Sequence, residues 1–347
     1  MKVLIVDPLS FIGHVNYNYG IIDALCQEYE FDVVCNEKLQ EKLVEKGIPT
    51  ERFVWTFPER WNICSLSEIY NKIIYHLLYR YYFLKVILKV FFLKKKYDFI
   101  LFTSIEILTF CFLSWLFDKK CAIVDHGIGI ILEKWYYKYS WKLCNKEIKI
   151  VVLEEFIKEK VEKVLPSKQI FVLHHPLPVM DINEISLKKD NVLIFAPSSS
   201  NSDNFLKKML DALIPNNVYV FAKSQSFEFH SSNIEITNGY ISNEEYHKKL
   251  NESQFILLPY KASYNYRISA ILFEALVLNK IILLLANNTL SYYKEIFPNN
   301  IVLFSENDSF ENVIKESLAA YIKPFPLPDL VSYEKSFLSM QLAKLIE

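Results

Sequence analysis

Two successive series of short apolar runs, each separated by helical patterns, constrain the fold of this chain more than any other feature. The runs of the first series are Val3–Val6, Asp32–Cys35, Phe99–Phe102, Ala122–Val124 and Ile148–Leu153. The runs of the second series are Val192–Ala196, Val218–Ala222, Phe255–Leu258 and Ile281–Leu285. Short strands that alternate with helices are typical of parallel sheets covered on both faces. The sequence therefore predicts an α/β protein with two doubly wound, parallel-sheet domains.

A turn-rich linker separates the two series. It begins at His174-His175-Pro176-Leu177-Pro178 and continues in polar residues to Asp190. A chain of 347 residues has a natural length for two domains, and we expect them at 1–174 and 175–330. Because ligands of open parallel sheets bind beyond the carboxyl ends of the strands, the two domains are expected to face a cleft.

The composition argues against several classes of protein. Hydrophobic residues make up 52% of the chain, which is enough for two cores, and a net charge of -1 provides no general attraction to nucleic acid. With only 6 glycines, no glycine-rich phosphate loop is available. The 6 cysteines lack the C-x-x-C spacing of metal sites and are typical of small buried residues in a reducing compartment.

The N-terminus does not have the pattern of a secretory signal. Lys2 precedes the apolar run Val3–Val6 and Asp7 ends it, whereas a secretory core is longer. Further along, Lys72–Lys96 is too charged to span a membrane, and Ile105–Phe117 is too short and predicts a core helix instead. We therefore expect a cytoplasmic protein.

A second informative stretch runs from Arg267 to Ile282. Its apolar residues follow helical spacing, at Ile268, Ile271, Leu272, Ala275, Leu276 and Leu278. Glu274 is the one carboxylate inside this apolar helix, and a buried carboxylate is costly unless it is hydrogen-bonded or paired. Such carboxylates often bind the hydroxyl groups of a polyol or a ribose. The alternative is an ordinary amphipathic helix on which Glu274 is exposed.

This stretch resembles the donor-nucleotide signature of GT-B glycosyltransferases of the large retaining group (group 1 glycosyltransferases). In that group one Glu opens the loop and contacts the sugar, and a second Glu in the helix holds the ribose hydroxyls of the nucleotide sugar. Glu274 matches the second Glu, whereas Tyr266 stands in place of the first. The resemblance covers about residues 192–304. It implies two Rossmann-like domains facing a cleft, with the donor bound by the second domain.

The resemblance also implies donor contacts at the ends of the preceding strands. Ser198 and Ser199 lie in a loop that helps to hold the donor diphosphate in the family. Lys223 ends the next strand, where a cation can reach a phosphate, and Tyr240 lies in a turn that contacts the nucleobase. Each of these residues also has a structural explanation that involves no ligand. The serines can form a helix-capping turn, Lys223 can be solvated and Tyr240 can belong to the core.

We assign the catalytic roles to Arg267 and His126. Arg267 opens the second-domain helix, where a guanidinium can hold two phosphate oxygens and offset the charge of the leaving group. GT-B enzymes generally use such cations in place of a divalent metal, so no metal is expected. A His equivalent to His126 contacts the donor sugar in relatives, and Gly13 and His14 are expected on the acceptor side. The alternatives are a surface ion pair for Arg267 and structural roles for both histidines.

The segment Lys72–Lys96 predicts contact with an anionic membrane surface. It carries seven basic residues and no acidic one, with tyrosines and phenylalanines between them. On such a helix, basic groups can reach lipid headgroups while aromatic rings remain in apolar surroundings. Trp135–Lys142 is a second basic aromatic patch. Because the basic residues of Lys72–Lys96 do not form one clean stripe, a partly buried helix with solvated lysines is the alternative.

These observations together predict a peripheral-membrane glycosyltransferase on the inner face of the plasma membrane. By resemblance, it transfers a sugar, with retention of configuration, from a nucleoside-diphosphate donor to a lipid-linked glycan acceptor. The leaving phosphate can take the acceptor proton in that mechanism, so neither a protein nucleophile nor a cofactor is required. A composition rich in Lys, Asn, Ile and Tyr is associated with AT-rich bacterial genomes and favours surface-polysaccharide assembly.

Two other functions stay open. A GT-B nucleotide-sugar epimerase is one, and it needs acid–base carboxylates in the cleft. The other is a catalytically inactive GT-B scaffold that binds the membrane or a partner transferase, an alternative that Tyr266 keeps open.

GT-B relatives commonly end in a helix that packs back on the N-terminal domain. Residues 331–347 predict such a helix, with an apolar face formed by Phe337, Met340, Leu342 and Leu345. Three prolines between 324 and 328 make the preceding segment stiff and extended.

Overall fold

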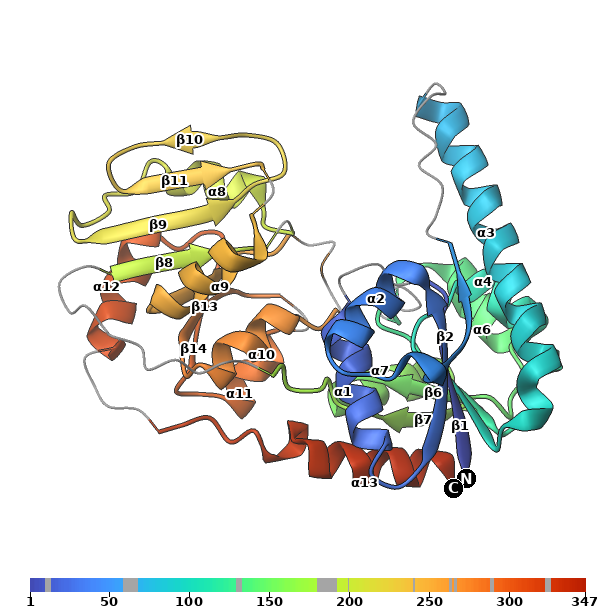
Figure 1. The fold of residues 1–347 in the computed structure, drawn as a ribbon. Coiled ribbons are helices and arrows are strands. Elements are labelled where there is room, and N and C mark those ends of the chain that lie inside the picture. Colours follow the sequence, from blue (N-terminus) through green and yellow to red (C-terminus); the bar gives the residue numbers. More distant parts are fainter. Residues whose placement is uncertain are drawn as a thin grey trace. The chain divides into compact units, whose positions relative to one another are not determined.

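The computed structural model divides the chain into two compact α/β units, each with its own sheet (Figure 1). Unit 1 consists of residues 1–176 and 331–347, and unit 2 of residues 177–330. The structure describes residues 1–9, 14–58, 68–128, 133–179, 192–198, 200–239, 241–261, 264, 267–287, 290–321 and 326–347. For residues 68–76, 320 and 321, the backbone alone is described.

Unit 1 is built on a seven-stranded parallel sheet with the strand order β3-β2-β1-β4-β5-β6-β7. The strands are β1 (Lys2–Asp7), β2 (Glu30–Asn36), β3 (Phe53–Phe57), β4 (Phe99–Phe102), β5 (Cys121–Val124), β6 (Lys149–Val152) and β7 (Gln169–Val172). The helices of this unit include α1 (Val15–Leu25), α2 (Glu37–Glu45), α3 (Glu68–Leu93), α4 (Ile107–Leu113), α6 (Trp135–Leu143) and α7 (Glu155–Val164). Every residue of β4, β5 and β6 is buried, as expected for parallel strands covered on both faces.

Unit 2 contains a second seven-stranded sheet with the order β10-β11-β9-β8-β12-β13-β14. The strands are β8 (Val192–Ala196), β9 (Val218–Lys223), β10 (Phe229–His230), β11 (Ile234–Thr237), β12 (Phe255–Leu258), β13 (Ile281–Leu285) and β14 (Ile301–Phe304). The helices are α8 (Asp203–Met209), α9 (Asn243–Glu252), α10 (Ala270–Val277), α11 (Tyr293–Ile296) and α12 (Phe310–Tyr321). All neighbouring strands are parallel except β10, which pairs antiparallel with β11.

In each unit, the direction in which strands are added to the sheet reverses once. The chain of unit 1 moves from β1 outward to β3 and then returns to place β4 on the other side of β1. Unit 2 repeats this pattern, with β12 placed beside β8 after β9 and β11. This arrangement confirms the predicted fold class of two doubly wound sheets. Ligands in such sheets bind at the point of reversal, beyond the carboxyl ends of β1 and β4 or of β8 and β12.

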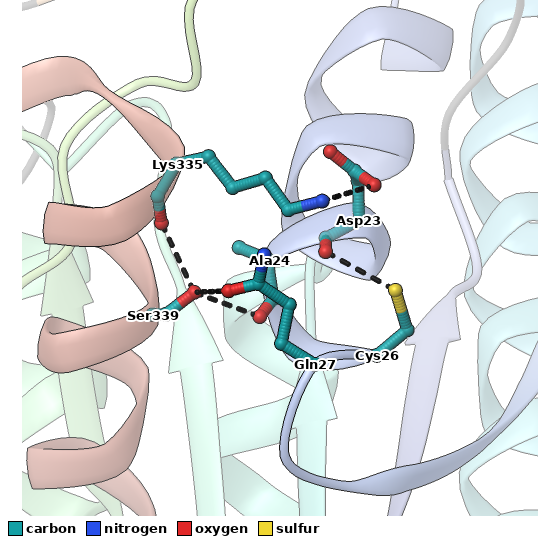
Figure 2. A network of polar contacts seen from close by, with 6 residues as sticks. All are labelled: Asp23, Ala24, Cys26, Gln27, Lys335 and Ser339. Carbon is teal, nitrogen blue, oxygen red and sulfur yellow. Dashed lines mark hydrogen bonds and ion pairs between the residues drawn. The ribbon is translucent and has the colours of Figure 1, made fainter.

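The last helix, α13 (Lys335–Ile346), packs on α1 within unit 1. Lys335 Nζ lies 2.7 Å from Asp23 Oδ1, and the Ser339 hydroxyl donates to the main-chain oxygen of Ala24 at 2.9 Å. Figure 2 shows these contacts between the two helices. The buried face consists of Leu338, Ser339, Leu342, Leu345 and Ile346. Met340, which the sequence assigned to the apolar face, is 57% exposed, because it lies two residues from both Leu338 and Leu342 on the opposite side of the helix.

The helix expected over Ile105–Phe117 is shorter and less buried than the sequence indicated. It consists of α4 followed by the 3₁₀ turn η4 (Ser114–Leu116). Phe110 is buried, but the Phe112 side chain is 80% exposed and the Trp115 side chain 71% exposed. The prediction of a core helix was therefore wrong for one face, because an apolar run does not reveal which of its residues a neighbouring element covers.

Gly20, in α1, lies against Pro176, and this packing can be tested. A Cβ atom on Gly20 would lie 2.3 Å from Pro176 Cβ, so a side chain there must push the helix and the proline apart. Although alanine is the better helix former, we expect Gly20→Ala to lower the free energy of unfolding by about 1–3 kcal/mol. Urea denaturation measures this change.

Gly239→Ala is the matched control for this substitution. Among the described residues, a Cβ on Gly239 would meet only the Thr237 hydroxyl, at 3.4 Å. The free energy of unfolding of this variant should therefore stay within about 0.5 kcal/mol of the wild-type value. A Gly20→Ala protein as stable as the wild type would contradict the packing described above.

Candidate functional sites

At the reversal point of unit 2, the loops that follow β8 and β12 contact each other. Asn201 and Tyr260 form an isolated antiparallel bridge between these loops. The Asn201 amide also donates to the main-chain oxygens of Ala196, at 3.0 Å, and Lys223, at 2.9 Å. The carboxyl ends of β8 and β9 are therefore held together by the buried Asn201 side chain, and the Asn201 backbone joins them to the loop after β12. Asn201 Oδ1 is buried and has no hydrogen-bond partner among the described residues.

A group of hydroxyls and aromatic rings lies where α10 begins. The Tyr260 hydroxyl is 2.7 Å from Ser269 Oγ, and the Tyr260 and Tyr264 rings stack with their centroids 4.0 Å apart. Ser269 caps α10 by accepting a hydrogen bond from the main-chain N–H of Leu272 at 3.2 Å. Arg267, two residues before this cap, has an exposed side chain. The first turn of α10 and a cation therefore lie next to the reversal point.

Glu274 is buried inside α10 and receives a hydrogen bond from the Tyr246 hydroxyl of α9. Burial raises the pKa of the Glu274 carboxyl, and the Tyr246 hydrogen bond opposes that rise. Burial, together with the charge of Glu274, also raises the pKa of the Tyr246 phenol, which therefore remains a donor. One donor leaves further lone pairs on the carboxylate for a ligand. No sequence spacing connects Tyr246 with Glu274, so the sequence did not identify this pair.

The other donor-side residues are partly placed by the structure. Ser198 is buried in the loop after β8, where its hydroxyl accepts a hydrogen bond from the Ser200 N–H at 3.0 Å. Lys223 ends β9 and its side chain is half-buried. Ser198, Lys223 and Arg267 thus lie at or after the carboxyl ends of three adjacent strands, with Glu274 on the helix that follows. The remaining donor-side residues Ser199, Tyr240 and Tyr266 lie outside the described residues, as does Gly13 on the acceptor side.

The reversal point of unit 1 is built around a buried carboxylate at the end of β1. Asp7 accepts hydrogen bonds from the Asn18 amide and the Ser104 hydroxyl, both at 2.5 Å. Asn18 Oδ1 in turn accepts from the Thr103 hydroxyl at 2.7 Å. Because Thr103 and Ser104 directly follow β4, this network joins β1, α1 and β4 at the point of reversal.

Four rings lie together at the same end of the unit 1 sheet. The His126 ring centroid is 4.5 Å from that of His14 and 4.6 Å from that of Tyr17, which is 5.4 Å from that of His175. The structure therefore brings together the two histidines that the sequence selected. His126 Nε2 donates to the main-chain oxygen of Thr103 at 2.9 Å if that nitrogen carries the proton. Burial lowers the pKa of His126 well below its usual value and that of His175 to about 4, so both rings are neutral near pH 7.

Three polar atoms of this region are buried and have no hydrogen-bond partner among the described residues. They are His14 Nδ1, the Tyr17 hydroxyl and Asp125 Oδ2. Such atoms are rare in folded proteins, so they indicate where a ligand or ordered water completes the site. The other oxygen of Asp125 accepts from the Gly127 N–H at 2.9 Å. Burial raises the pKa of the Asp125 carboxyl to about 6, which suits a group that gives and takes a proton near neutral pH.

Asp7, Tyr17 and Asp125 are not among the residues that the sequence predicts for the site. A signal was present for the two carboxylates, because each is the first acidic residue at the carboxyl end of an apolar strand. No such signal marks Tyr17, which is one of many tyrosines in the chain. In the part of the chain that the structure describes, no cluster of His, Cys, Asp and Glu is suited to a metal ion. Within the same residues, no helix is long and apolar enough to cross a membrane.

Comparison with known proteins places this architecture among GT-B folds. No protein-family model and no curated protein sequence matches the chain. HepE of Anabaena, in complex with UDP and glucose, aligns with a TM-score of 0.67 and 11% identity over 99% of this chain and 98% of that chain. Arabidopsis thaliana UGT89C1 complexed with UDP aligns with a TM-score of 0.59 and 13% identity over 100% of both chains.

A UDP-GlcNAc 2-epimerase shows the same degree of likeness. The enzyme from Neisseria meningitidis, bound to UDP-GlcNAc, aligns with a TM-score of 0.59 and 13% identity over 100% of this chain and 99% of that chain. The chain therefore has the GT-B fold, which glycosyltransferases and this epimerase share.

The raised pKa of Asp125 leads to a test of the unit 1 site. The carboxyl has a pKa of about 6 in the folded chain against 3.8 for a free side chain, so folding favours its protonated form. Its ionisation therefore destabilises the fold as the pH rises from about 4 to above 6. Asp125→Asn should raise the free energy of unfolding at pH 8 by up to about 3 kcal/mol, and this gain should disappear by about pH 4.

Urea denaturation across that pH range measures the gain. Asp211→Asn, at an exposed position of unit 2, is the control and should leave stability unchanged at every pH. An Asp125→Asn effect that is the same at pH 4 and pH 8 would mean that the carboxyl has an ordinary pKa.

Proposed function

We propose that this protein is a glycosyltransferase that moves a sugar from a nucleoside-diphosphate donor to a glycan acceptor. The observation that carries the proposal is Glu274, which is buried beside the reversal point of unit 2 and hydrogen-bonded by Tyr246. A carboxylate that is enclosed there, yet can accept further hydrogen bonds, is suited to the paired hydroxyl groups of a ribose. HepE and UGT89C1, which share the fold, both have structures in complex with UDP.

In this proposal, residues 175–330 bind the donor. Glu274 accepts hydrogen bonds from the ribose, and the Arg267 guanidinium holds the diphosphate. The loop of Ser198 and Ser199 and the Lys223 ammonium contribute further phosphate contacts. By resemblance, Tyr240 contacts the nucleobase and Tyr266 lies next to the donor sugar.

Residues 1–174, with the helix of residues 331–347, bind the acceptor in this proposal. Gly13 and His14 follow β1 on the acceptor side, and His126 is assigned to the sugar. Because His126 is neutral, its ring can exchange hydrogen bonds with sugar hydroxyls and add no charge to the site. Asp125, whose pKa lies near neutrality, is a further candidate for contact with an acceptor hydroxyl.

We infer that the reaction is metal-independent and retains the anomeric configuration. The bond between the anomeric carbon and the leaving phosphate oxygen breaks, and the acceptor oxygen attacks from the same face. The leaving phosphate takes the acceptor proton, so the protein need not supply a nucleophile. Arg267 stabilises the negative charge that develops on the leaving diphosphate.

A lipid-linked glycan on the inner face of a bacterial plasma membrane is the acceptor that we propose, with surface-polysaccharide assembly as the setting. Lys72–Lys96 supports this choice, since it would hold unit 1 on anionic lipid. In its described part, Lys85, Lys89, Lys95 and Lys96 are exposed. The Arg80 guanidinium, by contrast, lies 3.9 Å from Glu106, and Lys94 Nζ donates to the main-chain oxygen of Leu116 at 2.6 Å.

Epimerisation of a nucleotide sugar is the second candidate function. Two observations favour it: the likeness to the UDP-GlcNAc 2-epimerase and the carboxyl of Asp125, which titrates near neutral pH. A panel of UDP- and GDP-sugars, followed by NMR, distinguishes the possibilities. A glycosyltransferase releases free nucleotide, an epimerase produces a new nucleotide sugar, and an inactive scaffold does neither.

Nucleotide binding provides the direct test of the donor site. Hydrogen bonds to a charged group contribute about 1.5–3 kcal/mol, so Glu274→Ala should weaken UDP or GDP binding roughly ten-fold or more. Tyr246→Phe retains the carboxylate and removes only its donor, and it should therefore weaken binding less. Isothermal titration calorimetry measures both affinities.

Glu252→Ala is the control for these variants, because Glu252 is an exposed glutamate of α9. It should bind nucleotide as the wild type does. Unchanged nucleotide affinity in a folded Glu274→Ala protein would remove the main support for the proposed function.

The proposed membrane contact predicts a salt-sensitive interaction with anionic vesicles. Each exposed lysine near such a surface contributes about 1 kcal/mol, and salt screens this attraction over about 8 Å at physiological ionic strength. Replacing Lys85, Lys89, Lys95 and Lys96 with Gln should therefore abolish the preference for anionic over neutral vesicles in co-sedimentation. Arg80 and Lys94 are left unchanged because they make contacts within the fold.

The same charge change on unit 2 is the control. Gln at the exposed lysines 207, 208, 248 and 315 should leave vesicle binding as it is in the wild type. If the wild-type protein did not bind anionic vesicles at low salt, the proposed role of Lys72–Lys96 would be contradicted.

A further inference from the structure

Within the described part of the chain, exposed aromatic side chains are confined to one part of unit 1. Among the described residues, every exposed Phe, Trp or Tyr belongs to α3, to α4 with its turn η4, or to α6. They are Tyr81, Phe92, Phe112, Trp115, Trp135, Tyr136 and Tyr139. Single exposed apolar residues are ordinary on protein surfaces, but a cluster of large ones marks an interaction site.

The spacing of these residues places them on one side of each helix. Trp135, Tyr139 and Leu143 follow each other at four-residue intervals on α6, and the Trp135 and Leu143 side chains are 73% and 81% exposed. Phe112 and Trp115 are three residues apart across α4 and η4. The opposite sides of the same helices are buried, through Phe110 on α4 and Trp141 on α6.

α4 packs against both α3 and α6, so the exposed residues belong to neighbouring helices (Figure 1). Lys94 Nζ, just after α3, donates to the main-chain oxygen of Leu116 in η4 at 2.6 Å. The N–H of Asn145, just after α6, donates to the Ser114 hydroxyl of η4 at 2.7 Å. We call this surface the aromatic face and define it by Phe92, Phe112, Trp115, Trp135, Tyr139 and Leu143.

Among the described side chains of these helices, every charged one is basic. Residues 77–93, 107–116 and 135–143 contain no Asp or Glu. Lys85 Nζ lies 4.6 Å from the Tyr81 ring centroid, and Lys142 Nζ lies 5.6 Å from that of Tyr139. Basic groups therefore stand directly beside the exposed rings, where they can reach anionic groups above the surface.

This combination favours lipid over protein as the partner. Protein interfaces are enriched in Arg and depleted in Lys, whereas Arg80 is the only Arg in these three ranges and lysines supply the rest of the charge. Trp and Tyr with neighbouring Lys are typical of the boundary between lipid headgroups and acyl chains.

We infer that the aromatic face inserts its side chains into the headgroup region of an anionic bilayer. The inference deepens the membrane contact proposed above and rests on that contact, but it does not depend on sugar transfer. The inference places α4 and α6 at the membrane, together with the segment Lys72–Lys96. Contact through lysines alone would disappear at high salt, whereas burial of aromatic side chains in lipid resists salt.

The experiment is flotation with vesicles of phosphatidylglycerol and phosphatidylcholine, at low salt and in about 0.5 M salt, a concentration that shortens the screening length to a few ångströms. The test variant carries Phe112→Ser, Trp115→Ser, Trp135→Ser, Tyr139→Ser and Leu143→Ser. All five positions are exposed, so the fold should persist, which circular dichroism and nucleotide titration verify. We expect wild-type protein to retain part of its binding at high salt and this variant to lose that part completely.

Two comparisons make the result specific. A control with Leu213→Ser, Leu327→Ser and Met340→Ser removes equally exposed apolar side chains elsewhere and should bind vesicles as the wild type does. Brominated lipids should quench the fluorescence of wild-type protein, and the quenching should fall when Trp115 and Trp135 are replaced by Phe.

Equal vesicle binding by the wild type and the serine variant would overturn the inference. The inference would also be overturned if sedimentation showed a wild-type dimer that the serine substitutions dissociate, and if the wild type showed no salt-resistant vesicle binding. The aromatic face would then join two copies of the chain. Failure of the wild type to bind UDP or GDP would instead count against sugar transfer and leave the membrane result standing.

Discussion

Both units depend on one property of parallel sheets. Because helices must cover both faces, the ends of the strands are the place where polar groups can gather and still meet a ligand. In unit 1 this end is organised by Asp7, which Asn18 and Ser104 hold at the point of reversal. In unit 2, Asn201 plays the corresponding part by joining the ends of three strands. These contacts join the described ends of the strands without the help of a ligand.

Buried polar groups fall into two classes in this protein. Asp7 and Glu274 accept hydrogen bonds from side chains of neighbouring elements. Asp125 and Tyr17, in contrast, each retain a buried polar atom that no described residue satisfies. Such atoms lower stability, and folded proteins retain them mainly where function requires them. The second class lies in unit 1, in the same region as the rings of His14 and His126.

The fold could be predicted because central strands such as β4 and β12 are continuous apolar runs, and the alternation of strands and helices then specifies a doubly wound sheet. Two strands near the edges of the sheets were not predicted. β3, at an edge, is half-exposed, and β11, next to the edge strand β10, alternates buried and half-buried residues, so neither is a plain apolar run. Residues whose partners lie far away in the sequence, such as Tyr246 and Glu274, could not be predicted either, because a tertiary contact produces no regular spacing along the chain. The exposure of Phe112 and Trp115 was hidden for the same reason.

The return of α13 to unit 1 has a consequence for the order in which the protein forms. Unit 2 lies between two segments that belong together, so it is an insertion within unit 1 along the chain. During synthesis, α1 emerges early, but the helix that covers it is added only after all of unit 2 has been made. The surface of α1 around Ala24 therefore stays uncovered through most of translation, while unit 2 already has every strand that it needs. The N-terminal unit is begun first and completed last.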